Sequence, residues 1–196
     1  MCNETCTGFV LAGGKSSRMG QDKALTDYRG RPLIRCAIDV LRELTEDVQI
    51  VGDPQRYSFL QLPVLPDQIP LHGPLSGIHA GLKATQTKHN FFLACDLPLM
   101  SSRFLWLLLS KMGNHDAVMM RFDDGTVEPL CSVYSVRCLP AIESSIREGQ
   151  LRTIGFLPKV HVRFLTETEL NESGLSRTIF TNVNTPEELC QLGDPS

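Results

Sequence analysis

The sequence predicts an α/β fold in which a mostly parallel sheet carries helices on both of its faces. Short apolar segments that suit buried strands alternate with segments whose apolar residues recur every three or four positions, the period of an amphipathic helix. The alternation is clearest in the first half of the chain and is typical of strand–helix–strand units. At 196 residues, the chain fits a single domain, residues 1–196, that can bury a large core without disulfides or structural metals.

Composition and charge argue against several classes of protein. Hydrophobic residues make up 42% of the chain and charged residues 21%, as in ordinary globular proteins. A net charge of −3 gives no broad basic surface for a nucleic acid. The longest apolar run, Phe104–Leu109, is too short to cross a bilayer, and the first residues lack the charged-then-apolar pattern of a signal peptide. We therefore expect a cytoplasmic protein that binds neither nucleic acid nor membrane.

The cysteines predict no disulfide framework. Seven is an odd number, and no two cysteines have the CxxC spacing that is typical of zinc and redox sites. We expect reduced thiols, several of them packed in the core.

The first half of the chain contains three predicted strands with helical segments between them. Phe9–Leu11 is an apolar strand that runs into a glycine loop. From Leu33, apolar residues line one face of a helix, and Val48–Val51 forms the second strand. A short helical piece is expected over Gln55–Leu60. Pro63–Pro66 fits a brief edge strand, where prolines are tolerated.

The second half continues the alternation. The expected helices are Leu75–Lys83, a helix capped by Ser101 or Ser102, and Val136–Glu148, and the expected strands are Asn90–Ala94, Asp116–Arg121, Leu130–Tyr134 and Val160–Leu165. The polar segment Thr166–Ser176 is assigned no element. Ile179 and Phe180 begin a last strand-like segment, and Thr185 is expected to cap a final helix from Pro186.

Four residues of types that suit a ligand-binding site directly follow predicted strands. They are Gly13, Gly52, Asp67 and Asp96. In open parallel sheets, ligands bind beyond the carboxyl ends of the strands. We therefore expect these residues to share one rim of the sheet.

The glycine loop after the first strand predicts a phosphate site. Gly13 and Gly14 let the backbone turn sharply and approach a ligand closely, so that several N–H groups can converge on an anion. Arg18 and Lys23 supply positive charge, one as a planar fork and one as a compact ammonium. The spacing fits neither a P-loop nor a GxGxxG dinucleotide fingerprint.

Asp96 ends the most apolar strand, within the sequence CDLP. An ionised carboxylate beside a buried strand must be paired or bind a cation, and magnesium favours one or two carboxylates with phosphate oxygens and water. The alternative is that Asp96 caps the turn that follows. Cys95 is expected to be a small packing residue and not a nucleophile, because no histidine lies near it in the sequence.

Four motifs give the chain a resemblance to a known family. The loop sequence LAGGKSSRMGQDK is similar to the signature of the molybdenum cofactor guanylyltransferase family, and CDLP resembles its metal-binding motif. Asp67 with Gly73–Gly77 resembles a D…GPLAG stretch, and NVNTPEE from Asn182 closely matches a C-terminal motif of the family. The resemblance covers nearly the whole chain. It implies a three-layer α/β/α, Rossmann-like nucleotidyltransferase fold of the nucleotide-diphospho-sugar transferase type.

The resemblance also implies an activity. Members of the family transfer GMP from GTP to molybdopterin with Mg²⁺ and release pyrophosphate. GTP and molybdopterin would then be the small-molecule partners, and molybdoenzymes or other cofactor-biosynthesis proteins would be the protein partners. Because the attacking group is already a phosphate, the reaction needs positioning and charge neutralisation more than a strong base.

The resemblance assigns roles to individual residues. The implied catalytic residues are Arg18, Lys23 and Asp96, and the implied nucleotide-binding residues are Leu11, Ala12, Gly13, Gly14, Lys23, Gly52, Asp67, Gly73 and Asp96. Asp96, with Asn182, is the implied metal site. Arg152 and Asn184 are the implied acceptor-binding residues, and Glu128 lies at a position that faces the acceptor.

Three alternatives stay open. Asp53 stands where guanylyltransferases often place an asparagine, so it either accepts from guanine or is an ordinary turn residue. The first alternative activity is therefore transfer from CTP to the same pterin, and the second is transfer to another small phosphate. The third, from another class, is a non-catalytic protein that binds a nucleotide or cofactor and delivers it.

Overall fold

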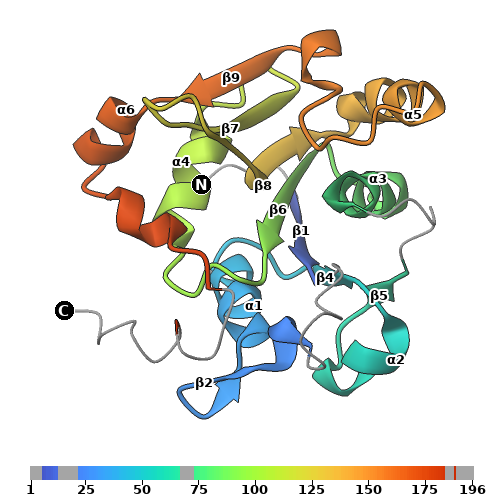
Figure 1. Cartoon of the computed structure of the whole chain (residues 1–196), viewed down its shortest axis with the longest axis vertical. Coiled ribbons are helices and arrows are strands. Elements are labelled where there is room, and N and C mark those ends of the chain that lie inside the picture. The colour runs from blue at the N-terminus through green and yellow to red at the C-terminus, as the bar shows by residue number, and fades with distance from the viewer. Residues whose placement is uncertain (1–5, 13–21, 67–72, 184–187, 189–196) are drawn as a thin grey trace.

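The computed structural model describes residues 6–12, 22–66, 73–183 and 188. Seven strands form one sheet in the order β5-β4-β1-β6-β8-β7-β9 (Figure 1). Strand β8 runs antiparallel to both of its neighbours, and the other strand pairs of this sheet are parallel. The strands are β1 (Cys6–Leu11), β4 (Val48–Val51), β5 (Val64–Leu65), β6 (His89–Ala94), β7 (Ala117–Arg121), β8 (Val127–Ser135) and β9 (Val162–Leu165). The predicted mostly parallel sheet is confirmed.

Helices cover both faces of this sheet, which gives three layers (Figure 1). One face packs against α1 (Ile34–Arg42) and α4 (Ser102–Ser110), and the other against α3 (Pro74–Ala84) and α5 (Leu139–Arg147). Side chains of β1 alternate between the two cores: Val10 lies in the first, and Phe9 and Leu11 lie in the second. The strand is therefore buried at every position, as expected for a strand between two layers of helices.

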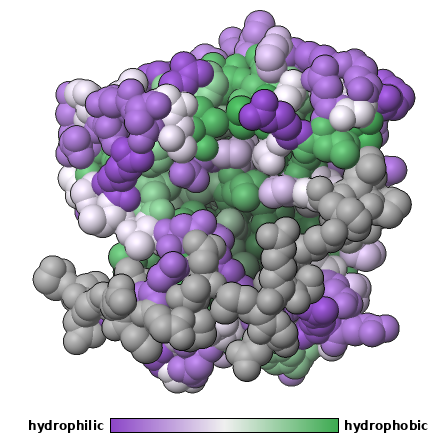
Figure 2. All heavy atoms as spheres, in the orientation of Figure 1, coloured by the Kyte–Doolittle hydropathy of each residue, from purple (hydrophilic) through white to green (hydrophobic). Residues whose placement is uncertain are grey.

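Figure 2 shows that one side of the molecule is hollowed near the middle of the view, with hydrophobic residues at the bottom of the hollow. In the described part of the chain, no helix is both long enough and apolar enough to cross a membrane.

Helix α3 packs against the sheet at a glycine that faces a buried ring. A Cβ added to Gly81 would be 2.7 Å from the Phe92 ring, which is fully buried and stacks on Phe9 with their centroids 5.0 Å apart. Real Cβ contacts do not reach this distance, so any larger residue at position 81 must push helix and sheet apart.

A short hairpin between β1 and α1 is absent from the sequence-based predictions. It pairs β2 (Asp27–Tyr28) with β3 (Arg31–Pro32), and its two turn residues, Arg29 and Gly30, have positive φ angles of 55° and 79°. Two-residue hairpin turns favour this backbone, but they usually place asparagine or aspartate before the glycine. Arg29 gives no such signal.

The strand predicted to begin at Ile179 and Phe180 is wrong. These residues belong to a 3₁₀ helix, Arg177–Phe180, and both are buried. The Phe180 ring meets Phe104 and Phe122 edge-on, with centroids 4.9 and 5.2 Å apart. Their apolar character thus serves core packing and not strand pairing.

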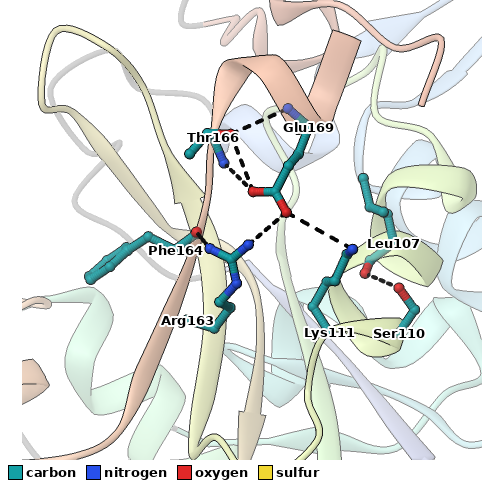
Figure 3. Close-up of polar contacts among 7 residues, drawn as sticks. All are labelled: Leu107, Ser110, Lys111, Arg163, Phe164, Thr166 and Glu169. Carbon is teal, nitrogen blue, oxygen red and sulfur yellow. Dashed lines mark hydrogen bonds and ion pairs between the residues drawn. The ribbon is translucent and has the colours of Figure 1, made fainter. Parts of the chain in front are cut away.

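The segment Thr166–Ser176, to which no element was assigned, contains helix α6 (Glu167–Glu172). Thr166 and Glu169 form a reciprocal capping box at its start. The Glu169 carboxylate also accepts from Arg163 Nη2 at 2.6 Å and lies 4.0 Å from Lys111 Nζ (Figure 3). This cluster ties α6 to β9 and to the residue that follows α4.

The pKa of Glu169 reflects these contacts. Burial alone would raise it, but the hydrogen bonds from Thr166 and the charge and hydrogen bond of Arg163 outweigh burial, so the pKa lies below its ordinary value of 4.5. A lowered pKa means that the contribution to stability is present above 4.5 and is lost as the pH falls through the folded-state pKa.

We predict that Glu169→Gln, which can keep the capping bond but loses the charge, lowers the free energy of unfolding at neutral pH by about 1 kcal/mol. Urea unfolding at a series of pH values would measure it, with Glu172→Gln in the same helix as the control. The difference from wild type should narrow as the pH falls below about 4.5, the ordinary value. A loss of unfolding free energy that does not change with pH would contradict a stabilising role for the Glu169 charge.

We also predict that Gly81→Ala lowers the free energy of unfolding by about 1–3 kcal/mol, because the added methyl group overpacks the core. The matched control is Gly77→Ala in the same helix, where the nearest atom to the new Cβ is a terminal methyl of Leu11 at 3.1 Å. That methyl can move, so the control should lose less. Equal losses in urea unfolding would contradict the explanation.

Candidate functional site

The carboxyl ends of β1, β4 and β6 lie side by side. Backbone hydrogen bonds continue the sheet beyond the strands, from Ala12 N to Val51 O at 2.9 Å and from Cys95 N to Leu11 O at 3.3 Å. Gly52 N likewise donates to Leu65 O at 2.9 Å. The structure therefore brings Leu11, Ala12 and Gly52 to the same rim as the segment that carries Asp96.

Lys23 joins three segments that are far apart in the sequence. It begins a 3₁₀ helix, Lys23–Leu25, and its Nζ lies 2.8 Å from Asp96 Oδ2 and 3.2 Å from Asn182 Oδ1. The Lys23 and Asp96 side chains are 21% and 22% exposed, so the ion pair is largely shielded but can be reached from solvent. The loop, the CDLP motif and the C-terminal motif thus meet at one ammonium group.

Asp96 pairs with a cation, as expected for a carboxylate at the end of a buried strand. The next helix, α4, is capped by Ser101, whose hydroxyl accepts from Arg103 N at 3.2 Å. The backbone of Asp96 also holds the C-terminal segment, because its carbonyl accepts from Val183 N at 3.0 Å. This bond places Asn182 beside the carboxylate.

A second carboxylate, that of Glu128 in β8, interacts electrostatically with Asp96. The pKa of Glu128 is raised, first by burial and second by the negative charge of Asp96. Glu128 therefore lies within electrostatic reach of the site.

The Cys95 thiol has low reactivity. Burial, with a smaller effect from the charge of Asp96, raises the pKa of its thiol to about 12. A thiol with this pKa is protonated at neutral pH and is a poor nucleophile, in agreement with the packing role predicted for it.

The Asp53 carboxylate makes the contacts expected of a turn residue. Its carboxylate caps α2 (Pro54–Tyr57) by accepting from Gln55 N at 2.9 Å. It also lies 3.4 Å from Arg56 Nε.

The start of α3 lies next to the loop that follows α5. Gly73 precedes the first helical residue, and a Cβ on Gly73 would be 3.8 Å from Leu151 O. Arg152 in this loop has an exposed side chain, and its carbonyl accepts from Gly155 N at 2.8 Å. Two apolar residues of the same loop, Leu151 and Ile154, are also exposed.

Tyr57 and Asp22 border the site but were not predicted from the sequence. Tyr57 Oη lies 2.8 Å from both Ala12 O and Asp22 Oδ2. Asp22 caps the 3₁₀ helix that Lys23 begins, by accepting from Ala24 N at 3.1 Å. An aspartate directly before a short helix is a usable sequence signal for the cap. No sequence rule links a tyrosine of a later helix to the glycine loop.

The remaining predicted residues lie outside the described part of the chain. They are Gly13, Gly14, Arg18, Asp67 and Asn184, together with the start of the helix predicted from Pro186.

The donor set suits a hard cation that also binds substrate oxygens. Asp96 and Asn182 offer a carboxylate and an amide oxygen at one point. Within the described residues, no group of three or more His, Cys, Asp or Glu side chains could hold a metal ion. Magnesium needs no such cage, since it binds through one or two carboxylates, phosphate oxygens and water. The described residues therefore fit Mg²⁺.

Comparisons with known proteins identify relatives of this chain. Residues 8–160 match the family model described as MobA-like NTP transferase domain. The chain is 37% identical over 184 residues to a probable molybdenum cofactor guanylyltransferase of Pelotomaculum thermopropionicum, covering 93% of this chain and 89% of the relative. It is 30% identical to the molybdenum cofactor guanylyltransferase of Vibrio cholerae, covering 94% of this chain and 89% of that one.

Solved structures show the same fold. Molybdopterin-guanine dinucleotide biosynthesis protein A of Archaeoglobus fulgidus superposes with a TM-score of 0.80 at 23% identity, over 94% of this chain and 95% of that chain. A protein of Aquifex aeolicus superposes with a TM-score of 0.77 at 29% identity, over 94% and 96% of the two chains. Its match to the family model and its similarity to these nearly full-length relatives show that the chain belongs to the MobA-like NTP transferase domain family.

Proposed function

We propose that this protein transfers GMP from GTP to molybdopterin and releases pyrophosphate. The observation that carries the proposal is the meeting of Lys23, Asp96 and Asn182 at the carboxyl ends of β1 and β6. The names of the relatives support guanine as the base and the molybdenum cofactor as the acceptor. The geometry itself supports chemistry at a phosphate group, because an ammonium lies beside two oxygen donors that could hold a metal cation.

In the proposed reaction, an oxygen of the acceptor phosphate forms a bond to the α-phosphorus of GTP. The bond from that phosphorus to the bridging oxygen breaks, and pyrophosphate leaves with the electron pair. The nucleophile is already anionic, so no side chain needs to remove a proton. The work of the protein is to align two anions and to neutralise their charge.

Lys23 is proposed to bind the phosphates while it remains close to Asp96. An ammonium has three donors, so Lys23 can keep Asp96 and still donate to a phosphate oxygen. Arg18 and the loop backbone of Leu11, Ala12, Gly13 and Gly14 would bind the rest of the triphosphate. Asp96 and Asn182 would hold Mg²⁺, which when bound neutralises charge on the phosphate oxygens.

The remaining proposed contacts divide between base and acceptor. Gly52, Asp67 and Gly73 would line the side of the base. Arg152 and Asn184 would bind the acceptor, with Glu128 on the same side. The loop of Arg152 lies against the start of α3, which supports a role next to the nucleotide.

We further propose that the protein works in the cytoplasm and passes its product to a molybdoenzyme or to another protein of cofactor biosynthesis. The support is the family membership together with the sequence composition.

The first prediction concerns the ion pair. Lys23→Ala and Asp96→Ala should each reduce turnover by roughly a hundredfold or more, because the first removes a positive charge proposed to act on the phosphates and the second removes the carboxylate proposed to hold Mg²⁺ and to position Lys23. Pyrophosphate release from GTP with molybdopterin and Mg²⁺ would measure turnover, and thermal unfolding would show that the fold is kept.

The matched controls are Arg31→Ala and Asp39→Ala, which break an ion pair that is about half exposed on the surface. They should turn over like wild type. Wild-type turnover of either site variant would contradict the mechanism. Nucleotide binding without pyrophosphate release by the wild-type protein would instead favour the non-catalytic delivery protein.

The second prediction concerns Cys95. Cys95 is partly exposed, but its raised thiol pKa keeps it protonated at pH 8, so it should react with iodoacetamide more slowly in the native protein than after unfolding. Peptide mass spectrometry would locate the label, and Cys95→Ser should keep most of the turnover. Rapid native labelling of Cys95, or an inactive but folded serine variant, would point to a covalent mechanism instead.

A further inference from the structure

One phenol bridges the two described ends of the glycine loop. Ala12 is the last described residue before the loop, and Asp22 is the first after it. Tyr57 Oη lies 2.8 Å from the Ala12 carbonyl oxygen and 2.8 Å from Asp22 Oδ2. Ala12 O and Asp22 Oδ2 are both acceptors, so the single proton of the phenol can be donated to either of them. Both acceptors therefore lie against the same hydroxyl group.

The surroundings of Tyr57 keep its hydroxyl protonated, so that it acts as a hydrogen-bond donor. The side chain of Tyr57 is 1% exposed. Burial raises the pKa of its hydroxyl, and the hydrogen bond to Asp22 and the charge of Asp22 raise it further. The hydroxyl is therefore protonated across the physiological range.

Asp22 links the Tyr57 hydroxyl to the backbone of the helix that Lys23 begins. Its Oδ1 accepts from Ala24 N at 3.1 Å and so caps the 3₁₀ helix that Lys23 begins. Its Oδ2, which contacts Tyr57, also lies 3.4 Å from Arg56 Nη1. The Asp22 side chain is only 13% exposed. A carboxylate held on both oxygens fixes the backbone from which Lys23 reaches Asp96.

The ring of Tyr57 has its place because residue 52 lacks a side chain. A Cβ on Gly52 would lie 2.7 Å from Tyr57 Cε2 and 3.2 Å from Ala12 O. The end of β4, the end of β1 and the start of the Lys23 helix therefore pack around one ring. This packing also explains why residue 52 is a glycine, without any contact between Gly52 and the nucleotide.

We propose that Tyr57 is a positioning residue of nucleotidyl transfer: its buried hydroxyl fixes the two ends of the glycine loop to each other and holds Lys23 in place for the phosphates. This inference rests on the proposed function for the identity of the phosphates. It assigns a role to a residue whose side chain is buried beside the glycine loop.

The test is Tyr57→Phe, which removes only the hydroxyl oxygen. We expect kcat/KM for GTP to fall about tenfold or more, because a small misplacement of a phosphate-binding group costs that much. The KM for the acceptor should stay unchanged. A merely structural tyrosine would not move the constants for one substrate alone.

Tyr134→Phe is the matched control. Tyr134 is also fully buried, and its hydroxyl also donates to a backbone carbonyl, that of Pro129, at 2.8 Å. It should lower the melting temperature to a similar extent but keep kcat/KM for GTP within about twofold, since surface and core changes away from the site act mainly on stability. Equal kinetic losses in the two variants would overturn the proposal.

A double-mutant cycle shows whether Tyr57 acts through Lys23. In a Lys23→Ala background, Tyr57→Phe should have little further effect on GTP affinity, because residues that act as a unit are not additive. Fully additive effects would overturn the proposal. If Tyr57→Phe does not fold, Asp22→Ala, which removes the carboxylate that links Tyr57 to the helix of Lys23, should show the same selective loss for GTP.

Direct titration with GTP separates this inference from the proposed function. If wild type releases no pyrophosphate with molybdopterin, the proposed acceptor is wrong. Tyr57→Phe should still bind GTP about tenfold more weakly. Wild-type GTP affinity in Tyr57→Phe would overturn the inference whatever the acceptor.

Discussion

A positive charge held against a carboxylate at the end of a buried strand is the constraint on which the site depends. Lys23 Nζ lies 2.8 Å from Asp96 Oδ2. A largely desolvated carboxylate needs such a partner, since an unpaired charge there would be costly. Strands β1 and β6 pair Leu11 with Ala94, so the chain leaves both strands at the same level of the sheet. The ion pair thus follows from the central parallel pairing.

The site brings one cation and two oxygen donors together from three separate segments. The cation is supplied by a short capped helix, and the oxygen donors come from the turn after β6 and from the C-terminal segment. Asn182 reaches the site because Val183 N donates to Asp96 O. The Tyr57 hydroxyl restricts the same site further, because it contacts both Ala12 O and Asp22 Oδ2. Electrostatics and packing therefore fix the same few atoms, and preorganisation of this kind suits phosphate transfer.

The sequence predicted what depends on local pattern. Apolar runs and helical periodicity predicted the alternating strands and helices, and the strand ends predicted where Gly52 and Asp96 would lie. Contacts between distant segments were less visible. Ile179 and Phe180 resembled a strand because they are apolar, but Phe180 packs on Phe104 and Phe122. The Tyr57 contacts span 35 and 45 residues, and no local rule reports such pairs. The extent of the domain and the roles of the site residues stay predictions.

The central claim is that the phosphorus bonded to the nucleoside moves to the acceptor at this ion pair. Incubation of the wild-type protein with molybdopterin, Mg²⁺ and GTP labelled at the α-phosphate tests it most directly, beside GTP labelled at the γ-phosphate and CTP labelled at the α-phosphate. We predict that label from α-labelled GTP enters the pterin product, while the γ-label appears in pyrophosphate. Transfer of the γ-label, or no transfer from either GTP, would contradict the account, and preferential transfer from CTP would contradict the assignment of the base.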